Sequence, residues 1–212
     1  MKAIKDLSAR IRISFALSLL VSFPLVGEAY APEGIVELPE LSTAEVIERL
    51  AERLPSEHRP SAGKLGRLLV KSAKQHHLSP ALILALIETE SSFRASALSS
   101  EGAVGLMQIK PSTAAYVATR YGLEYAGPAD LEDPAQNLRL GITYLAYLKA
   151  RFGHSQHYLA AYNLGPARLL GRLKREEGLG NIELYVSRIH GRTRILQTKA
   201  KASARRKLAA QI

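Results

Sequence analysis

Residues 79–93 read SPALILALIETESSF, and this stretch decides the fold. Ser79 followed by Pro80 is typical of a helix start, because proline fits the first turn of a helix. The apolar residues 81–87 would cover nearly every face of that helix. A helix without a polar face must be buried by its neighbours, so this one is predicted to lie at the centre of the domain.

The segments on either side of this stretch are also predicted to be helical. Ser42 with Glu45 forms one capping box, and Asp133 with Gln136 brackets Pro134 in another. The expected helices are 42–54, 64–76, 111–121, 133–152 and 155–163, with further pieces after residues 166 and 180. Residues 94–110 are predicted to form an irregular loop, and no alternating run is long enough to predict a strand. The pattern therefore predicts an all-α, single globular domain of about seven to nine helices with little or no sheet.

The composition is that of an ordinary globular protein. The chain has 212 residues, of which 47% are hydrophobic and 23% are charged. It contains no cysteine, which excludes disulfides, thiolate metal sites, a cysteine nucleophile and lipid attachment at an N-terminal cysteine.

The formal net charge of +10 is concentrated near the C-terminus. No acidic residue follows Glu183, whereas eight Lys and Arg residues lie between positions 188 and 207. Residues 191–212 are therefore interpreted as a basic tail, either a solvated helix or a disordered arm. Contact of this tail with an anionic envelope surface is the alternative, and a nucleic-acid partner is not expected.

The N-terminus has the pattern of an export signal. A basic segment, residues 2–12, precedes an apolar run, residues 13–26, and small residues follow at positions 27, 29 and 31. Residues 1–29 are predicted to be a signal peptide cleaved after Ala29, with cleavage after Ala31 or an uncleaved membrane anchor as alternatives. The mature protein is expected in the periplasm or cell envelope and is not a lipoprotein. Residues 30–60 then form a linker and a first helix, and residues 61–190 the main domain.

Two carboxylates end the central apolar helix. Glu88 and Glu90 lie two residues apart, about 200° around a helix, so they cannot act as a pair on one face. Burial and the negative pole of the helix dipole both favour the neutral form of a carboxyl group at this end. A general acid for glycosidic cleavage needs that property. A solvated helix end is the alternative interpretation of the local pattern.

A longer set of motifs carries a family resemblance. In chain order they are Glu90-Ser91, Ser99, Gly102-Ala103, Gly105-Leu106-Met107-Gln108, Pro111, Asn137, Gly141, Tyr144-Leu145, Ala161-Tyr162-Asn163 and Gly165-Pro166. Over roughly residues 65–190, this pattern resembles the catalytic domain of the soluble lytic transglycosylases, bacterial enzymes that cleave murein. The resemblance implies a lysozyme-like fold and peptidoglycan glycan strands as the partner.

The resemblance also implies a reaction. Glu90 would protonate the glycosidic oxygen between N-acetylmuramic acid and N-acetylglucosamine, then deprotonate the C6 hydroxyl that closes a 1,6-anhydro ring. Because the nucleophile is internal, no second carboxylate, metal or cofactor is required, unlike in two-carboxylate glycosidases. Glu101 is the best candidate if a second acid exists. A lysozyme-like hydrolytic muramidase and a non-catalytic murein-binding module are the alternatives.

The remaining site residues are carried over from the same resemblance. Tyr162 corresponds to a family tyrosine whose hydroxyl faces the catalytic glutamate, and Ser99 to a serine near the substrate acetamido group. Gln108 offers an amide that suits sugar substituents. The other expected substrate-binding residues are Gly105, Met107 and Asn163, although Met107 has the character of a core residue and Asn163 that of a helix end.

Two positions depart from the family pattern. Many members have a glutamate four residues before the tyrosine that matches Tyr185, whereas this chain has Asn181 there and Glu183 two residues later. Lys110 stands where an apolar residue is common, and its charge would suit the anionic lactyl-peptide substituents of murein.

Overall fold

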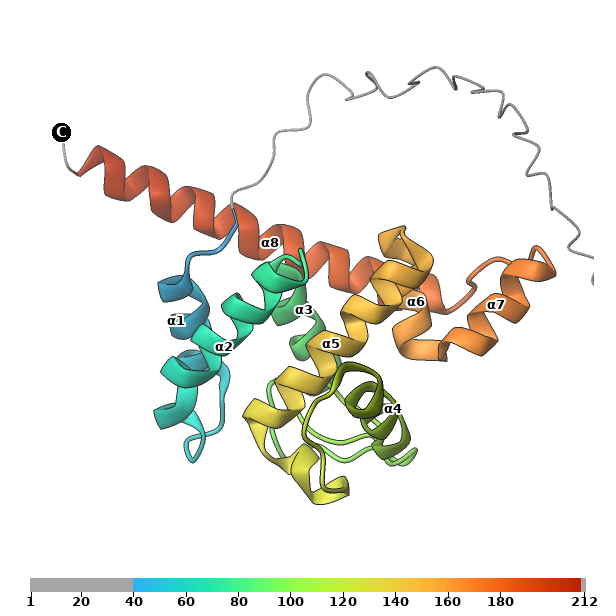
Figure 1. Ribbon diagram of the computed structural model, residues 1–212. Helices are drawn as coiled ribbons and strands as arrows, with labels where there is room; N and C mark the ends of the chain where they lie inside the picture. The colour runs from blue at the N-terminus through green and yellow to red at the C-terminus, as the bar shows by residue number, and fades with distance from the viewer. Residues whose placement is uncertain (1–39, 211–212) are drawn as a thin grey trace, which may run out of the picture. The chain divides into compact units, whose positions relative to one another are not determined.

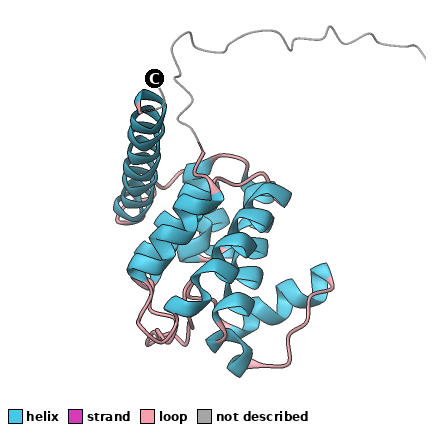
Figure 2. Cartoon of the chain, turned by 90° about the vertical axis from the view of Figure 1, so that its left-hand side faces the viewer, coloured by secondary structure: helices cyan, strands magenta, loops and turns pink. Residues whose placement is uncertain are grey.

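The computed structural model describes residues 40–210, which belong to one compact unit (Figure 1). The α-helices are α1 (Thr43–Arg53), α2 (Ala62–Gln75), α3 (Pro80–Glu90), α4 (Pro111–Tyr121), α5 (Pro134–Phe152), α6 (Ser155–Leu164), α7 (Pro166–Lys174) and α8 (Ile182–Ala209). Two short 3₁₀ helices, η1 (Arg59–Ser61) and η2 (Pro128–Glu132), connect them. Within the described range Figure 2 shows helices and loops without strands, so the predicted all-α class is confirmed.

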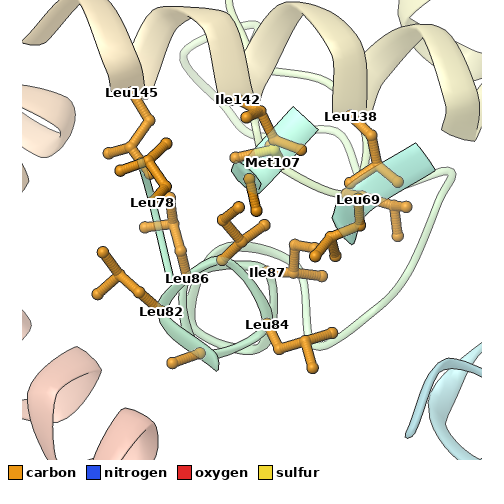
Figure 3. Close-up of a cluster of buried hydrophobic side chains, with 14 of the residues drawn as sticks. Leu69, Leu78, Leu82, Leu84, Leu86, Ile87, Met107, Leu138, Ile142 and Leu145 are labelled. Atoms are coloured by element: carbon orange, nitrogen blue, oxygen red, sulfur yellow. The ribbon is translucent and has the colours of Figure 1, made fainter. Parts of the chain in front are cut away.

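Helix α3 lies at the centre of this unit, as predicted. All of its residues from Pro80 to Ile87 are buried. It contacts α1, α2 and α8, and its side chains meet those of α5 in the core (Figure 3). Full burial of one large aliphatic side chain contributes about 1.5–3 kcal/mol. The apolar faces of α3 are therefore the main reason that the other helices pack around it.

The two predicted capping boxes differ in outcome. At α1, the backbone N–H of Glu45 donates to Ser42 Oγ (3.3 Å) and the Ser42 N–H donates to Glu45 Oε2 (2.8 Å). At α5, Asp133 Oδ1 accepts from the Gln136 N–H at 2.7 Å. The Gln136 side chain does not return this bond, because its Nε2 donates to the carbonyl oxygen of Glu124. Only half of the second box is therefore formed.

Helix α8 is one continuous helix of 28 residues. Its buried residues Val186, Ile189, Leu196 and Ala200 recur at helical spacing. The predicted boundary between a domain ending at 190 and a tail from 191 therefore falls inside this helix. Beyond residue 201 nearly all its side chains are exposed.

The predicted signal peptide and linker, up to residue 39, lie outside the described residues. No helix between residues 40 and 210 is both long and apolar enough to cross a membrane.

Candidate active site

The C-terminal end of α3 opens into a hollow of about 530 Å³, here called the Glu90 hollow. Its walls come from the loop after α3 and from α4, α5, α6 and α7. The lining side chains that carry polar groups are Glu90, Ser99, Glu101, Gln108, Lys110, Thr113, Tyr144, Tyr162, Asn163 and Arg168. The predicted residues Glu90, Tyr162, Ser99, Gln108 and Asn163 are thus brought together, whereas Gly105 and Met107 are buried and do not line the hollow.

Glu90 is the last residue of α3 and is largely buried at the hollow. Burial raises the pKa of its carboxyl to about 7, and a hydrogen bond donated by Tyr185 partly opposes this by favouring the carboxylate. Because the pKa is near neutrality, the group can give a proton away and take one back under ordinary conditions. These are the two tasks of a general acid that later acts as a base.

This raised pKa gives a testable pH dependence of stability. The pKa of Glu90 is higher in the folded chain, about 7, than its ordinary value of 4.5. The resulting stabilisation is fully present below pH 4.5 and is lost as the pH rises through 7, because only the unfolded chain ionises freely in that window. We expect wild type to lose about 3 kcal/mol relative to Glu90→Gln between these limits. Urea denaturation of both proteins from pH 4 to 8 measures this, and parallel curves would contradict it.

The hydroxyl group that contacts Glu90 belongs to Tyr185 on α8. Its O–H donates to Glu90 Oε1, while the hydroxyl of Tyr162 donates to the carbonyl oxygen of Met107 at 2.8 Å. Burial raises the pKa of both tyrosines well above its ordinary value, so both remain protonated donors. Tyr162 lies in the wall of the hollow without a direct hydrogen bond to Glu90. Sequence reasoning missed Tyr185, because the departure from the family pattern beside it concerns an acid, at Asn181, and gives no signal for a hydroxyl.

The loop between α3 and α4 is fixed by side chains from its own ends. Ser91 is buried and donates from Oγ to the carbonyl oxygen of Leu106 at 2.8 Å. Gln108 donates from Nε2 to the carbonyl oxygens of Ala97 (2.9 Å) and Gly105 (3.1 Å). The Gln108 side chain therefore stabilises the loop through two hydrogen bonds to its backbone. The same side chain also lines the Glu90 hollow.

Asn137 of α5 holds the same loop from below and is 1% exposed. Its Oδ1 accepts from the N–H of Met107 at 2.8 Å, and its Nδ2 donates to the carbonyl oxygens of Val104 (2.8 Å) and Leu131 (3.0 Å). Gly105 packs against this amide with φ +81°, and a Cβ there would lie 2.7 Å from the carbonyl oxygen of Leu131. Gly105 is thus required for close packing, in a backbone conformation that favours glycine.

The rim of the hollow carries side chains of both positive and negative charge. Lys110 Nζ lies 3.4 Å from Glu101 Oε2, and both side chains are well exposed. Such a surface pair contributes little to stability, so each group is free to meet a ligand. Arg168 of α7 adds a second positive side chain to the lining. Among residues 40–210, no group of three His, Asp or Glu side chains could hold a metal ion.

A second hollow adjoins the first and is called the tyrosine hollow. It has a volume of about 410 Å³ and shares Thr113 and Tyr144 with the Glu90 hollow. The ring centroid of Tyr144 lies 5.4 Å from that of Tyr162 and 6.2 Å from that of Tyr147. Tyr116 continues the row at 5.5 Å from Tyr147. Aromatic rings thus extend the surface outward from the site.

The sequence matches a known family. A family model described as the transglycosylase SLT domain matches residues 67–184. Over 104 residues the chain is 34% identical to the soluble lytic murein transglycosylase of Salmonella typhimurium, covering 48% of this chain and 16% of that protein. It is 35% identical over 113 residues to the membrane-bound lytic murein transglycosylase C of Actinobacillus pleuropneumoniae, covering 49% and 31%. The chain thus spans less than a third of the length of either relative.

Solved structures show the same fold. An inactive mutant of the lytic transglycosylase Slt from Pseudomonas aeruginosa matches with a TM-score of 0.59 and 32% identity, over 68% of this chain and 25% of that one. The 70 kDa soluble lytic transglycosylase of Escherichia coli matches with a TM-score of 0.60 and 24% identity, over 74% and 29%. The second likeness shows the fold alone and confirms the predicted lysozyme-like class.

Proposed function

The chain belongs to the transglycosylase SLT domain family, and on that premise we propose that it is a lytic transglycosylase that cleaves the glycan strands of murein. Its proposed catalytic acid and base is Glu90. The observation that carries this proposal is a single, largely buried carboxyl, with a pKa raised to about 7, placed at a polar hollow. The other acidic side chain in the described lining is Glu101, which is exposed at the rim.

The geometry supports a defined order of proton transfers. Tyr185 occupies Oε1 of Glu90, so the transferable proton belongs on Oε2. In the proposed reaction this proton moves to the glycosidic oxygen as the bond from C1 of the muramic acid to that oxygen breaks. The resulting carboxylate then takes the proton of the C6 hydroxyl, and O6 bonds to C1. Atoms and charge balance without water, and Glu90 ends protonated as it began.

The Glu90 hollow suits a saccharide that carries acidic substituents. Hydroxyl, amide and carbonyl groups line it, and these bind sugar hydroxyls and acetamido groups. Lys110 and Arg168 supply positive charge for the lactyl-peptide carboxylates of murein. The adjoining tyrosine hollow provides aromatic surface on which a further sugar of the strand can stack. The proposed substrate is therefore a strand of several sugars.

The mass of the products separates the two enzymatic alternatives. We expect digestion of purified murein sacculi to give muramic acid ends that are lighter by one water than hydrolytic ends, as measured by mass spectrometry. Only reducing ends would instead identify a hydrolytic muramidase. Intact sacculi with bound protein would identify a binding module. A glutamate is also important in the Pseudomonas relative, whose inactive form carries a glutamate-to-glutamine substitution.

Murein lies outside the cytoplasmic membrane, so the proposed activity requires export of the chain. This agrees with the expected signal at residues 1–29. A relative from Actinobacillus pleuropneumoniae is named as membrane-bound. We propose that this protein acts in the periplasm or cell envelope.

A further inference from the structure

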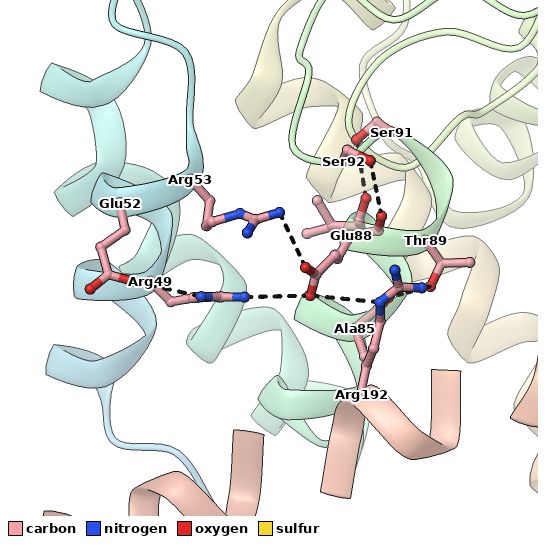
Figure 4. Close-up of polar contacts among 10 residues, drawn as sticks. Arg49, Glu52, Arg53, Ala85, Glu88, Thr89, Ser91, Ser92 and Arg192 are labelled. Atoms are coloured by element: carbon pink, nitrogen blue, oxygen red, sulfur yellow. Dashed lines mark hydrogen bonds and ion pairs between the residues drawn. The ribbon is translucent and has the colours of Figure 1, made fainter. Parts of the chain in front are cut away.

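Three consecutive residues at the end of α3 each contact a side chain of a neighbouring helix. Figure 4 shows these contacts for Glu88 and Thr89. Arg192 of α8 places Nε 3.8 Å from Glu88 Oε2. The same guanidinium donates from Nη1 to Thr89 Oγ1 at 3.0 Å. Tyr185, also on α8, donates to Glu90. Two side chains of α8, Arg192 and Tyr185, therefore contact the last turn of α3.

The spacing of Tyr185 and Arg192 along α8 couples their contacts with α3. Tyr185 and Arg192 are seven residues apart, which is two turns, so they lie on the same face of the helix. The buried Ile189 lies between them on that face. Since a helix is stiff over two turns, fixing Arg192 also fixes the height and rotation at which Tyr185 meets α3.

The other polar residues at the start of α8 make no such contact with α3. Asn181, the residue before the helix, makes no side-chain cap hydrogen bond and is exposed. Glu183 in the first turn is also exposed. The polar contacts that tie this part of α8 to α3 are therefore made by Tyr185 itself and by Arg192, beside the apolar packing of Val186 and Ile189.

Glu88 connects this arrangement to α1. Arg53 Nη2 lies 3.1 Å from Glu88 Oε1, and Arg49 Nη2 lies 3.5 Å from Glu88 Oε2. The Glu88 side chain is only 17% exposed, so these pairs are screened less than surface pairs. One carboxylate thus receives three guanidinium groups, two from α1 and one from α8. Its charge attracts Arg192, whose closer contact is the hydrogen bond to Thr89 Oγ1.

We propose that Arg192 is a positioning residue, which ties α8 to Glu88 and Thr89 and thereby sets the Tyr185 hydroxyl on Glu90. In naming Glu90 as the catalytic acid, this inference rests on the proposed function. The positioning itself concerns contacts of the folded chain and is measurable without substrate. Arg192 touches no reacting group and acts through Tyr185.

The groups that face Glu90 define what a titration will report. Tyr185 approaches from α8, Tyr162 from α6 and Tyr144 from α5. The loop and α7 add Glu101, Lys110 and Arg168 around the hollow. Only Tyr185 among these donates a hydrogen bond to Glu90, and this bond lowers the pKa that burial raises. Loss of the bond must therefore raise the pKa of Glu90 further.

The test is a ¹³C NMR titration of the Glu90 carboxyl carbon, assigned by its absence in Glu90→Gln. Tyr185→Phe is expected to raise the Glu90 pKa by about 1, because a hydrogen bond to a charged group is lost. Arg192→Met is expected to raise it in the same direction, and Arg192→Lys by less. In the Tyr185→Phe background, Arg192→Met should add no further rise. Arg188→Met, at an exposed position on the same helix, should leave the pKa at its wild-type value.

Several outcomes overturn the proposal. If Tyr185→Phe raises the pKa of Glu90 while Arg192→Met leaves it unchanged or lowers it, Arg192 does not position the hydroxyl. If Arg192→Met only lowers the melting temperature and leaves the Glu90 pKa unchanged, Arg192 has a structural role and does not position the hydroxyl. If Arg192→Met does not fold, Arg192→Lys is the deciding variant. A rise in the Glu90 pKa in Arg192→Lys supports the proposal, and an unchanged pKa overturns it. If wild type does not cleave murein, the proposed function fails but this titration still decides the positioning role.

Discussion

Glu90→Gln is expected to abolish murein cleavage, lowering the rate by about 10³-fold or more, while the protein folds and still binds sacculi. A glutamine amide cannot donate a proton to the leaving oxygen or accept one from the C6 hydroxyl, and each general acid or base step contributes about 10²–10⁴-fold. Its carbonyl oxygen can still accept from Tyr185, so the local structure is preserved. Release of soluble fragments measures cleavage, and co-sedimentation with sacculi measures binding.

Two other glutamates serve as comparisons for this variant. Glu183→Gln changes an exposed glutamate on α8 and should retain wild-type activity. Glu101→Gln removes the rim carboxylate that pairs with Lys110. If Glu101→Gln were as inactive as Glu90→Gln, a two-carboxylate hydrolytic mechanism would replace the proposed one. If Glu90→Gln cleaved sacculi at the wild-type rate, Glu90 would have no part in the chemistry.

Asn137→Ala is expected to have the largest effect on stability, lowering the free energy of unfolding by about 2–4 kcal/mol. The substitution removes the acceptor of the buried Met107 N–H and the donor to two carbonyl oxygens, those of Val104 and Leu131. A buried group left without a partner costs about 1–3 kcal/mol. Because these groups belong to the loop that lines the Glu90 hollow, activity should fall even at temperatures where the protein remains folded.

Asn163→Ala is the matched comparison, because Asn163 is exposed at the hollow. It should change the free energy of unfolding by less than about 0.5 kcal/mol, as expected for a surface substitution. Urea denaturation followed by circular dichroism measures both variants. Equal stability of Asn137→Ala and wild type would mean that water or other groups satisfy the loop without the amide.

The helices were predictable because their signals are local. The apolar run from 81 to 87 determines the burial of α3, and the box at Ser42 determines where α1 begins. Glu90 was found through the same run, since a carboxylate at the end of a buried helix is unusual, and through the family motifs. The hollow collects most of the residues those motifs indicated.

The contacts between helices could not be predicted in the same way. Tyr162 was predicted to face Glu90 and lies with it in the lining of the hollow, but its hydroxyl donates to the Met107 carbonyl, and Tyr185 donates to the acid. Such choices depend on how two helices pack, which spacing within one helix does not determine. Residues 191–209 are helical, one of the two predicted forms of the tail, and they continue α8 without a break at residue 190. The basic residues of this segment mask the apolar stripe that continues to Ala200.

The tyrosine that meets Glu90 belongs to α8, the last helix of residues 40–210, and lies 95 residues further along the chain. During synthesis, the segment from α1 to α6 emerges before this helix exists. A polypeptide interrupted before Ile182 would therefore carry the carboxyl without the phenol that accompanies it. The complete pair can therefore assemble only after translation has passed residue 185.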